Sequence, residues 1–148
     1  MNRKEIITEL KKFFSVKELV CNHIYSKFGE LSWSFIRTEQ LHTILVIRRD
    51  ILKVPLTCND NSTFTQRGVR CNLCQLVKDK TNAGKIYMSS HVLGAGNDFQ
   101  SPNMTSRNPI SISLLRWQFG KNWGWTIFWL GCGLWVIKEL YCKISKPG

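Results

Sequence analysis

The sequence predicts one α+β domain, with helices packed on a small and mostly antiparallel sheet. First, 148 residues suit a single domain of ordinary size that can bury a core. Second, a hydrophobic content of 43% with a mean hydropathy of −0.16 excludes a disordered chain and a polytopic membrane protein. Third, apolar residues follow helical spacing in the N-terminal half, and short extended stretches bounded by turn-forming residues come later.

Two helices are expected near the N-terminus. The first is indicated by apolar residues at three- and four-residue intervals, Ile6, Leu10, Phe13 and Phe14, opposite a basic face. Ser15 and Glu18 then form a capping-box pattern, in which each side chain satisfies a backbone N–H at a helix start. This pattern predicts a second, short helix ending near Cys21.

Residues 38–52 carry the clearest helical pattern in the chain. The positions with helical spacing are Leu41, Ile44, Leu45, Arg48, Ile51 and Leu52. We expect the aliphatic stem of Arg48 to lie along the edge of the apolar face. His42 is expected on the surface of this helix rather than as a metal ligand.

The middle of the chain predicts short elements. Residues 54–58 indicate a strand, with Pro55 at its start or on an edge. Residues 71–80 suit another helix, and residues 86–88 a strand that leads into 89–99. That last segment contains Gly-Ala-Gly at 94–96, which permits tight backbone geometry beside a site.

The composition changes after Phe99. Residues 1–99 form the main, organised part of the domain, and residues 100–122 read as a polar linker or a diverged segment. Residues 123–148 are a Trp-rich, apolar tail whose uncharged stretch, 15 residues long, is short of the ~20 needed to span a bilayer. The tail is a diverged strand region, an interfacial or membrane-facing segment, or the product of out-of-frame translation.

The charge of the chain predicts an anionic partner. Lys and Arg number 21 against 10 Asp and Glu, which gives +11 and favours nucleic acid, anionic lipid or acidic cell-wall polymer. Residues 1–14 carry charges throughout, so they are not expected to act as a secretory signal.

Four Cys and His residues have the identities that structural zinc prefers. They occur as Cys21-x-His23 and Cys71-x-x-Cys74. The two pairs are far apart in sequence, so spacing alone does not bring them together. The alternative is that Cys21 and Cys74 are small buried hydrophobic residues and His23 lies on the surface.

A second metal-binding pattern lies across the glycine-containing turn. His91 and Asp98 are seven residues apart, and such a turn can direct both side chains at one zinc ion. We expect the small antiparallel sheet to carry both residues. A catalytic zinc needs a third protein ligand as well. The alternative for the two residues is a hydrogen-bonded structural pair.

The order of residues in 89–98 resembles the S-x-H-x-x-G-x-A-x-D pattern of the zinc D,D-carboxypeptidase and L-alanyl-D-glutamate endopeptidase family, which includes VanX-type dipeptidases and phage endolysins. The matching residues are Ser89, His91, Gly94 and Asp98, with Gly96 in place of the alanine. Upstream, Arg67 and Asn72 match the family's S-G-x-R-x-x-x-x-N segment without its Ser-Gly pair. Residues 53–57 and 14–19 are also similar to family segments, so the resemblance covers about residues 13–99.

This resemblance implies roles for particular residues. His91 and Asp98 would bind Zn²⁺, and Arg67 would hold the carbonyl or carboxylate of the substrate through its guanidinium group. Arg70 competes for that role. Ser89 would hydrogen-bond the substrate or a zinc ligand, or else cap the turn.

The family completes its site with a C-terminal acidic general base and a further histidine. No histidine follows Asp98 here, and the substitute at matching spacing is Glu139-x-x-Cys142. Cys142 would then supply a thiolate ligand and Glu139 the general base. The alternative is a solvated glutamate and an incidental cysteine.

The favoured function is a zinc-dependent peptidase that cleaves peptidoglycan peptides, with an incomplete or inactive peptidase as an option. It would stay in the host cytoplasm until released to the cell wall, with membrane association through the tail as an option. One alternative is a basic nucleic-acid-binding module held by zinc at Cys21, His23, Cys71 and Cys74. Nucleic acid is the less favoured partner because the basic residues are scattered. Another alternative is a catalytically dead protein associated with the cell wall or membrane.

Overall fold

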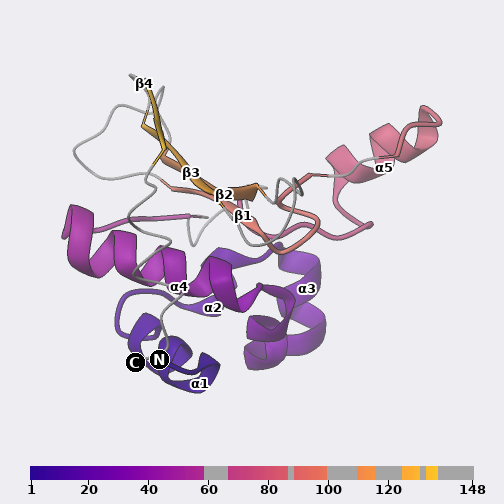
Figure 1. The fold of residues 1–148 in the computed structure, drawn as a ribbon. Coiled ribbons are helices and arrows are strands. Elements are labelled where there is room, and N and C mark those ends of the chain that lie inside the picture. The colour runs from indigo at the N-terminus through magenta and orange to yellow at the C-terminus, as the bar shows by residue number, and fades with distance from the viewer. Residues whose placement is uncertain (59–66, 87–88, 100–109, 116–124, 131–132, 137–148) are drawn as a thin grey trace.

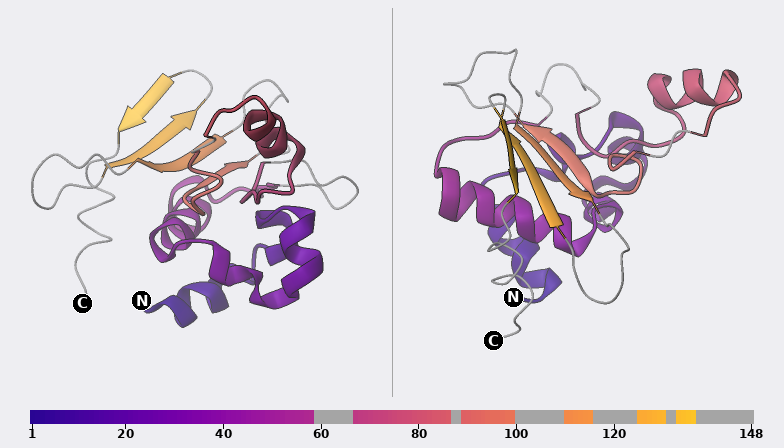
Figure 2. Two further views of the ribbon diagram at one scale, coloured as in Figure 1. Left: turned by 90° about the vertical axis from the view of Figure 1, so that its right-hand side faces the viewer. Right: turned by 45° about the horizontal axis from the view of Figure 1, so that its top comes forward.

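The computed structural model describes residues 1–58, 67–86, 89–99, 110–115, 125–130 and 133–136. Helices fill the N-terminal part of the chain, and strands follow in the C-terminal part (Figure 1). Helices α1 to α4 gather on one side of the molecule, and the strands lie against them on the other (Figures 1 and 2).

The first two helices form as their sequences predict. Helix α1 (Arg3–Leu10) buries Ile6 and Leu10 and begins with a capping box between Asn2 and Glu5. Helix α2 (Val16–Leu19) begins with the predicted capping box, in which the Ser15 N–H donates to Glu18 Oε1 at 2.8 Å. These caps satisfy backbone donors that would otherwise have no partner at a helix start.

The chain continues through two helices that the sequence patterns had not indicated. Helix α3 (Asn22–Phe28) ends at Gly29, whose φ of +52° suits a residue without a side chain. The 3₁₀ helix η1 (Gly29–Phe35) follows and buries Trp33. Helix α3 matters for the site because Cys21 is its N-cap residue and His23 lies in its first turn.

The single helix predicted for residues 38–52 is in fact two consecutive elements. Helix α4 (Thr38–Val46) continues into a π-helical segment, η2 (Ile47–Leu52), and Lys53 then takes a left-handed conformation with φ +55°. The guanidinium carbon of Arg48 lies 4.7 Å from the centre of the Phe13 ring, which fits the expected position of its stem along an apolar edge. His42 lies half-buried on α4, not fully on the surface.

Two of the elements predicted for the middle of the chain need correction. Residues 54–58 are not a strand, and Pro55 has no N–H to donate to a strand ladder. Helix α5 (Gln75–Asn82) begins four residues after the predicted start, because Cys71 to Cys74 form a turn in which the Cys74 N–H donates to the Cys71 carbonyl at 3.1 Å. Helix α5 extends away from the other helices (Figures 1 and 2).

Four strands form one sheet in the order β1-β2-β3-β4, with every neighbouring pair antiparallel. Their bounds are β1 (Gly96–Phe99), β2 (Ile110–Leu115), β3 (Trp125–Leu130) and β4 (Gly133–Val136). Strand β1 pairs with β2 in a register that sets Asp98 opposite Ser111. Strand β2 falls in the segment expected to be a linker, and β3 and β4 fall in the Trp-rich tail. The sequence also predicts a strand at residues 86–88, but Tyr87 and Met88 lie outside the described residues. A carboxypeptidase-like α+β assignment stays a prediction.

The core lies among the helices and the end of β1. Its largest fully buried side chains include Phe99, Ile6, Leu10, Leu19, Leu41, Ile44 and Leu45. The rings of Phe14 and Phe99 meet with their centres 5.6 Å apart, which joins the start of the chain to β1.

One buried amide fastens β1 to the helices. Asn97 is fully buried, and its Nδ2 donates to the Leu19 carbonyl at 3.0 Å while its Oδ1 accepts from Gln40 Nε2 at 3.2 Å. A buried amide with its partners in place fixes its strand because leaving those partners costs free energy. The neighbouring residue, Asp98, is thereby held at a defined position.

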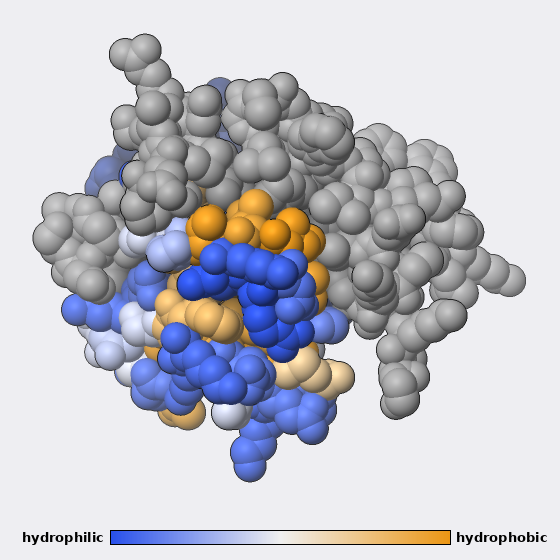
Figure 3. Space-filling model, turned by 90° about the vertical axis from the view of Figure 1, so that its left-hand side faces the viewer, coloured by the Kyte–Doolittle hydropathy of each residue, from blue (hydrophilic) through white to orange (hydrophobic). Residues whose placement is uncertain are grey.

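Hydrophilic side chains cover much of the described surface in Figure 3, with a smaller apolar area between them. Within the described residues, no helix combines the length and the apolar character needed to cross a bilayer.

Candidate metal centres

A short backbone pairing joins the start of α3 to the segment 67–74. Val20 and Val69 form an isolated parallel bridge, in which the Val69 N–H donates to the Leu19 carbonyl at 2.9 Å and the Cys21 N–H donates to the Val69 carbonyl at 2.7 Å. Gly68 permits this approach, because a β-carbon there would collide with the Leu19 carbonyl. The pairing brings together residues about 50 positions apart in sequence.

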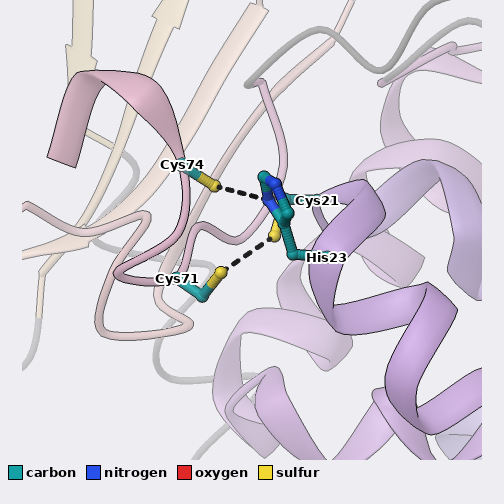
Figure 4. A group of neighbouring side chains, drawn as sticks. All are labelled: Cys21, His23, Cys71 and Cys74. Carbon is teal, nitrogen blue, oxygen red and sulfur yellow. Dashed lines mark hydrogen bonds between the residues drawn. The ribbon is translucent and has the colours of Figure 1, made fainter. Parts of the chain in front are cut away.

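The pairing places four potential ligands around one point. Cys21 and His23 come from the start of α3, and Cys71 and Cys74 from the turn before α5 (Figure 4). Their ligand atoms all lie within 4.8 Å of one another. The Sγ atoms of Cys21 and Cys71 are 3.6 Å apart, and Cys74 Sγ is 3.8 Å from His23 Nδ1. The four residues are therefore close enough to hold a metal ion.

Two of these distances lie close to the edges of a zinc tetrahedron. With Zn–S bonds of about 2.3 Å and Zn–N bonds of about 2.0 Å, the edges measure about 3.8 Å between two sulfurs and about 3.5 Å between sulfur and nitrogen. The Cys21–Cys71 and Cys74–His23 separations fall within about 0.3 Å of these values. The widest separation in the group needs a contraction of about 1 Å.

Burial is the main influence on the pKa of two thiols in this group. Cys21 and Cys74 are buried, Cys71 is half-buried and His23 is exposed. The pKa of the Cys21 thiol is raised to about 12: burial is the main cause, the backbone of Ile24 lowers the pKa through a hydrogen bond, and the neighbouring Cys74 and Cys71 thiols contribute to the rise. Burial likewise raises the pKa of the Cys74 thiol. Without a cation these thiols stay protonated near neutral pH, and a coordinated dication is the partner that would stabilise their thiolates.

The second predicted pair, His91 and Asp98, also comes together. His91 Nε2 lies 3.4 Å from Asp98 Oδ2, and the two side chains are 12% and 25% exposed. The Nδ1 atom of His91 lies 3.1 Å from the Gly68 carbonyl, which can only accept, so Nδ1 carries the proton of this contact. In a neutral imidazole Nε2 then presents a lone pair toward the carboxylate.

The backbone around this pair is anchored to the same segment, 67–74. The Asp98 N–H donates to the Arg67 carbonyl at 3.0 Å, and the Arg70 N–H donates to the His91 carbonyl at 3.2 Å. Backbone groups of three residues of this segment, Arg67, Gly68 and Arg70, thus hold both members of the pair. A histidine whose second ring nitrogen donates to a backbone carbonyl is typical of metal ligands.

His91 is carried by a tight turn and not by the sheet, which corrects the expectation that the small sheet carries both residues. Residues 90–94 form the turn, the Ala95 N–H donates to the Ser90 carbonyl at 2.8 Å, and Asp98 alone of the pair lies on β1. Gly94 has φ +65°, and a β-carbon there would collide with the Phe35 carbonyl. The glycine therefore sets how closely the turn approaches η1.

The remaining predicted site residues have different surroundings. Arg67 lies beside the pair, with Nη1 3.5 Å from the Cys58 carbonyl. Burial raises the pKa of the Cys58 thiol well above its usual range, and the charges of Asp98 and Arg67 act on that pKa in opposite directions. The Ser89 hydroxyl is buried with no hydrogen-bond partner in the part of the chain that the structure describes. Glu139 and Cys142 lie outside the described residues.

Sequence patterns missed the backbone groups that organise both clusters. Gly68 and Val69 supply the carbonyls that hold His91 and Cys21, and Asn97 fixes β1 from within the core. The glycine next to Arg67 was the signal that could have indicated a close backbone approach. Comparison of this chain with family models, curated proteins and solved structures found no match.

Proposed function

We propose that this chain is a zinc-dependent peptidase that acts on the peptide bonds of peptidoglycan, with a carboxypeptidase-like α+β fold. The observation that carries the proposal is the 3.4 Å approach of His91 Nε2 to Asp98 Oδ2 while Nδ1 already has a partner in the Gly68 carbonyl. With bonds of about 2.0–2.1 Å, a tetrahedral zinc ion bound by a nitrogen and an oxygen has an edge of about 3.3 Å between them. The distance in the structure supports this interpretation.

The pair also has the accessibility that a catalytic site needs. Both side chains keep part of their surface exposed, so a third ligand and a substrate can reach them. Zinc, when bound, lowers the pKa of a coordinated water and polarises the substrate carbonyl. The four-ligand group at Cys21 lacks a free position of this kind, which is why we assign catalysis to His91 and Asp98.

The roles of the chain's own residues follow from their positions. The Gly68 carbonyl holds the His91 ring in the tautomer whose Nε2 can bind a cation, and the Arg67 carbonyl holds Asp98. The Arg67 guanidinium would bind the substrate carbonyl and stabilise the negative charge that develops on its oxygen. Arg70 would bind a substrate carboxylate, and the Ser89 hydroxyl would hydrogen-bond the substrate.

Two further roles fall on the C-terminal tail. Cys142 would be the third ligand, and Glu139 would accept the proton of the attacking water. The substrate class rests on the resemblance in residues 13–99 and on the net charge of +11, which favours an anionic wall. The chain would wait in the host cytoplasm until release to that wall.

The test is hydrolysis of purified peptidoglycan by the full chain supplied with zinc. Mass spectrometry of the soluble products should find peptides with new amino and carboxyl ends, and His91→Ala should reduce their release at least a hundredfold. The matched control is His42→Gln, which changes a histidine of α4 and should release peptides at the rate of the unchanged chain. Absence of released peptides at saturating zinc would overturn the proposal.

The same preparation separates the two alternative functions. Sedimentation with peptidoglycan in the absence of cleavage would identify a catalytically dead wall-binding protein. Tight, salt-sensitive binding to DNA without wall clearing would identify a nucleic-acid-binding module. Either result would contradict the peptidase.

A further inference from the structure

We propose that Cys21, His23, Cys71 and Cys74 bind one Zn²⁺ ion in a closed, structural site that is separate from the His91–Asp98 pair. The proposal does not depend on the peptidase activity. It rests on four side chains from two segments whose ligand atoms all lie within 4.8 Å of one another (Figure 4).

The donor set selects the ion and the role. Three thiols and one imidazole form one of the common structural zinc sets, and soft thiolate donors favour zinc over Mg²⁺ or Ca²⁺. Four protein ligands fill a tetrahedron and leave no position for water, so this site would bind but not catalyse. The Cys71-x-x-Cys74 spacing is the spacing that zinc sites use within one turn.

The backbone holds the two halves of the site in place without any ion. The Cys74 N–H donates to the Cys71 carbonyl at 3.1 Å, which closes the turn that presents both sulfurs. The Cys21 N–H donates to the Val69 carbonyl at 2.7 Å. Val69 lies two residues before Cys71, so this bond fixes the start of α3 close to the turn. An ion bound there would fasten segment 67–74 to α3 through four bonds in addition to the existing backbone pairing.

A disulfide between Cys21 and Cys71 is the competing use of these thiols. Their sulfurs are 3.6 Å apart, well beyond the S–S bond length of about 2.05 Å, and all four described cysteines are free thiols. A disulfide would also leave Cys74 facing His23 at 3.8 Å without a covalent partner. The geometry therefore favours shared coordination of one ion.

The experiment is a titration of the reduced full chain with Co²⁺, which replaces zinc and reports its ligands by absorption. The chain carries Cys142→Ser, so that the thiolate proposed for the other site contributes nothing. We expect a tetrahedral d–d spectrum with thiolate-to-cobalt charge transfer that saturates at one ion per chain, and Zn²⁺ should displace it. Adding His91→Ala should leave this spectrum unchanged, which keeps the result distinct from the fate of the peptidase.

Variants of the four residues complete the test. Cys74→Ser should remove the charge-transfer band, whereas His23→Cys should retain one ion and strengthen the band because a fourth thiolate is added. The matched control is Leu73→Ser, an exposed residue inside the same turn, which should bind as the unchanged chain does. A folded chain that shows no charge-transfer band would overturn the proposal. Aerobically purified protein whose mass is lower by two hydrogens, as a Cys21–Cys71 disulfide requires, would overturn it as well.

Discussion

At the scale of single residues, Gly94 and Gly84 offer a matched pair of substitutions. Their φ angles are +65° and +67°, but a β-carbon at Gly94 would collide with the Phe35 carbonyl, whereas nothing lies within 4 Å of one at Gly84. A left-handed conformation costs an alanine about 1 kcal/mol, and a backbone collision adds to that cost. We expect Gly84→Ala to lower the free energy of unfolding by about 1 kcal/mol and Gly94→Ala by about 3 kcal/mol.

Urea unfolding of the two variants measures this difference. Gly94 lies in the turn that carries His91, so Gly94→Ala should also weaken metal binding at His91, and Gly84→Ala should not. Equal losses of stability in the two variants would show that the turn does not pack on η1.

His42 predicts a component of the pH dependence of stability. Burial is the main cause that lowers its pKa from 6.5, and the charges of the N-terminus and Arg49 lower it further, while Asp50 raises it. Because the folded pKa lies below the unfolded one, the unfolded chain binds more protons as the pH falls from about 6.5 toward the folded pKa. Above about pH 6.5, His42 therefore costs the folded chain no stability. As the pH falls from about 6.5 toward the folded pKa, the free energy of unfolding decreases.

The measurement is the free energy of unfolding across this pH window for the unchanged chain and for His42→Gln. Glutamine has no charge to gain, so the variant should lose less stability on acidification. Identical pH profiles would show that His42 is not desolvated in the folded chain.

Several site residues could be predicted from sequence, and others could not, for a physical reason. The Ser15–Glu18 cap and the approach of His91 to Asp98 depend on contacts within about ten residues, which local patterns encode. The convergence of Cys21 on Cys71 depends instead on the pairing of Val20 with Val69. Such a pairing between distant segments leaves no periodicity in the sequence.

At the scale of elements, segment 67–74 is the part of the chain that both candidate metal centres share. Its carbonyls hold His91, Asp98 and Cys21, and its last residue and Cys71 face α3. Loss of the proposed zinc at Cys74 should therefore loosen the backbone under the His91–Asp98 pair.

Hydrogen exchange tests this coupling through named amides. In Cys74→Ser we expect faster exchange at Val69 and Asp98, whose N–H groups donate to Leu19 and Arg67. The amide of Leu10 in α1, which lies in the core away from this segment, should keep its rate. Unchanged exchange at Val69 and Asp98 would show that the ion adds nothing to the backbone pairing that already holds segment 67–74.

Two helices show what local sequence patterns do not determine: the type of helix and the residue at which it begins. The apolar spacing of residues 38–52 predicts a helix but does not distinguish an α-helix from the π-helical end at Ile47–Leu52, because both present a similar apolar face. The helix predicted at Cys71 begins at Gln75, since its first residues form the turn that presents two thiols. In both cases long-range packing, and not helix propensity, decided the type or the start of the helix.

At the scale of the whole molecule, the net charge of +11 predicts association with anionic polymers. Raising the ionic strength from about 0.01 M to about 0.15 M shortens the Debye length from about 30 Å to about 8 Å. Binding to teichoic-acid-bearing walls should fall several-fold over this range. Sedimentation assays measure it, with an uncharged polysaccharide as the control, and salt-independent binding would contradict a role for the charge.

We propose two distinct zinc sites in this chain, a closed one at Cys21, His23, Cys71 and Cys74 and an open one at His91 and Asp98. Native mass spectrometry of the full chain, purified with zinc, tests this proposal most directly. We expect two zinc ions in the unchanged chain and in Leu73→Ser, and one ion in either His91→Ala or Cys74→Ser. A folded chain that carries no zinc, or one whose zinc content is the same in all four proteins, would contradict it.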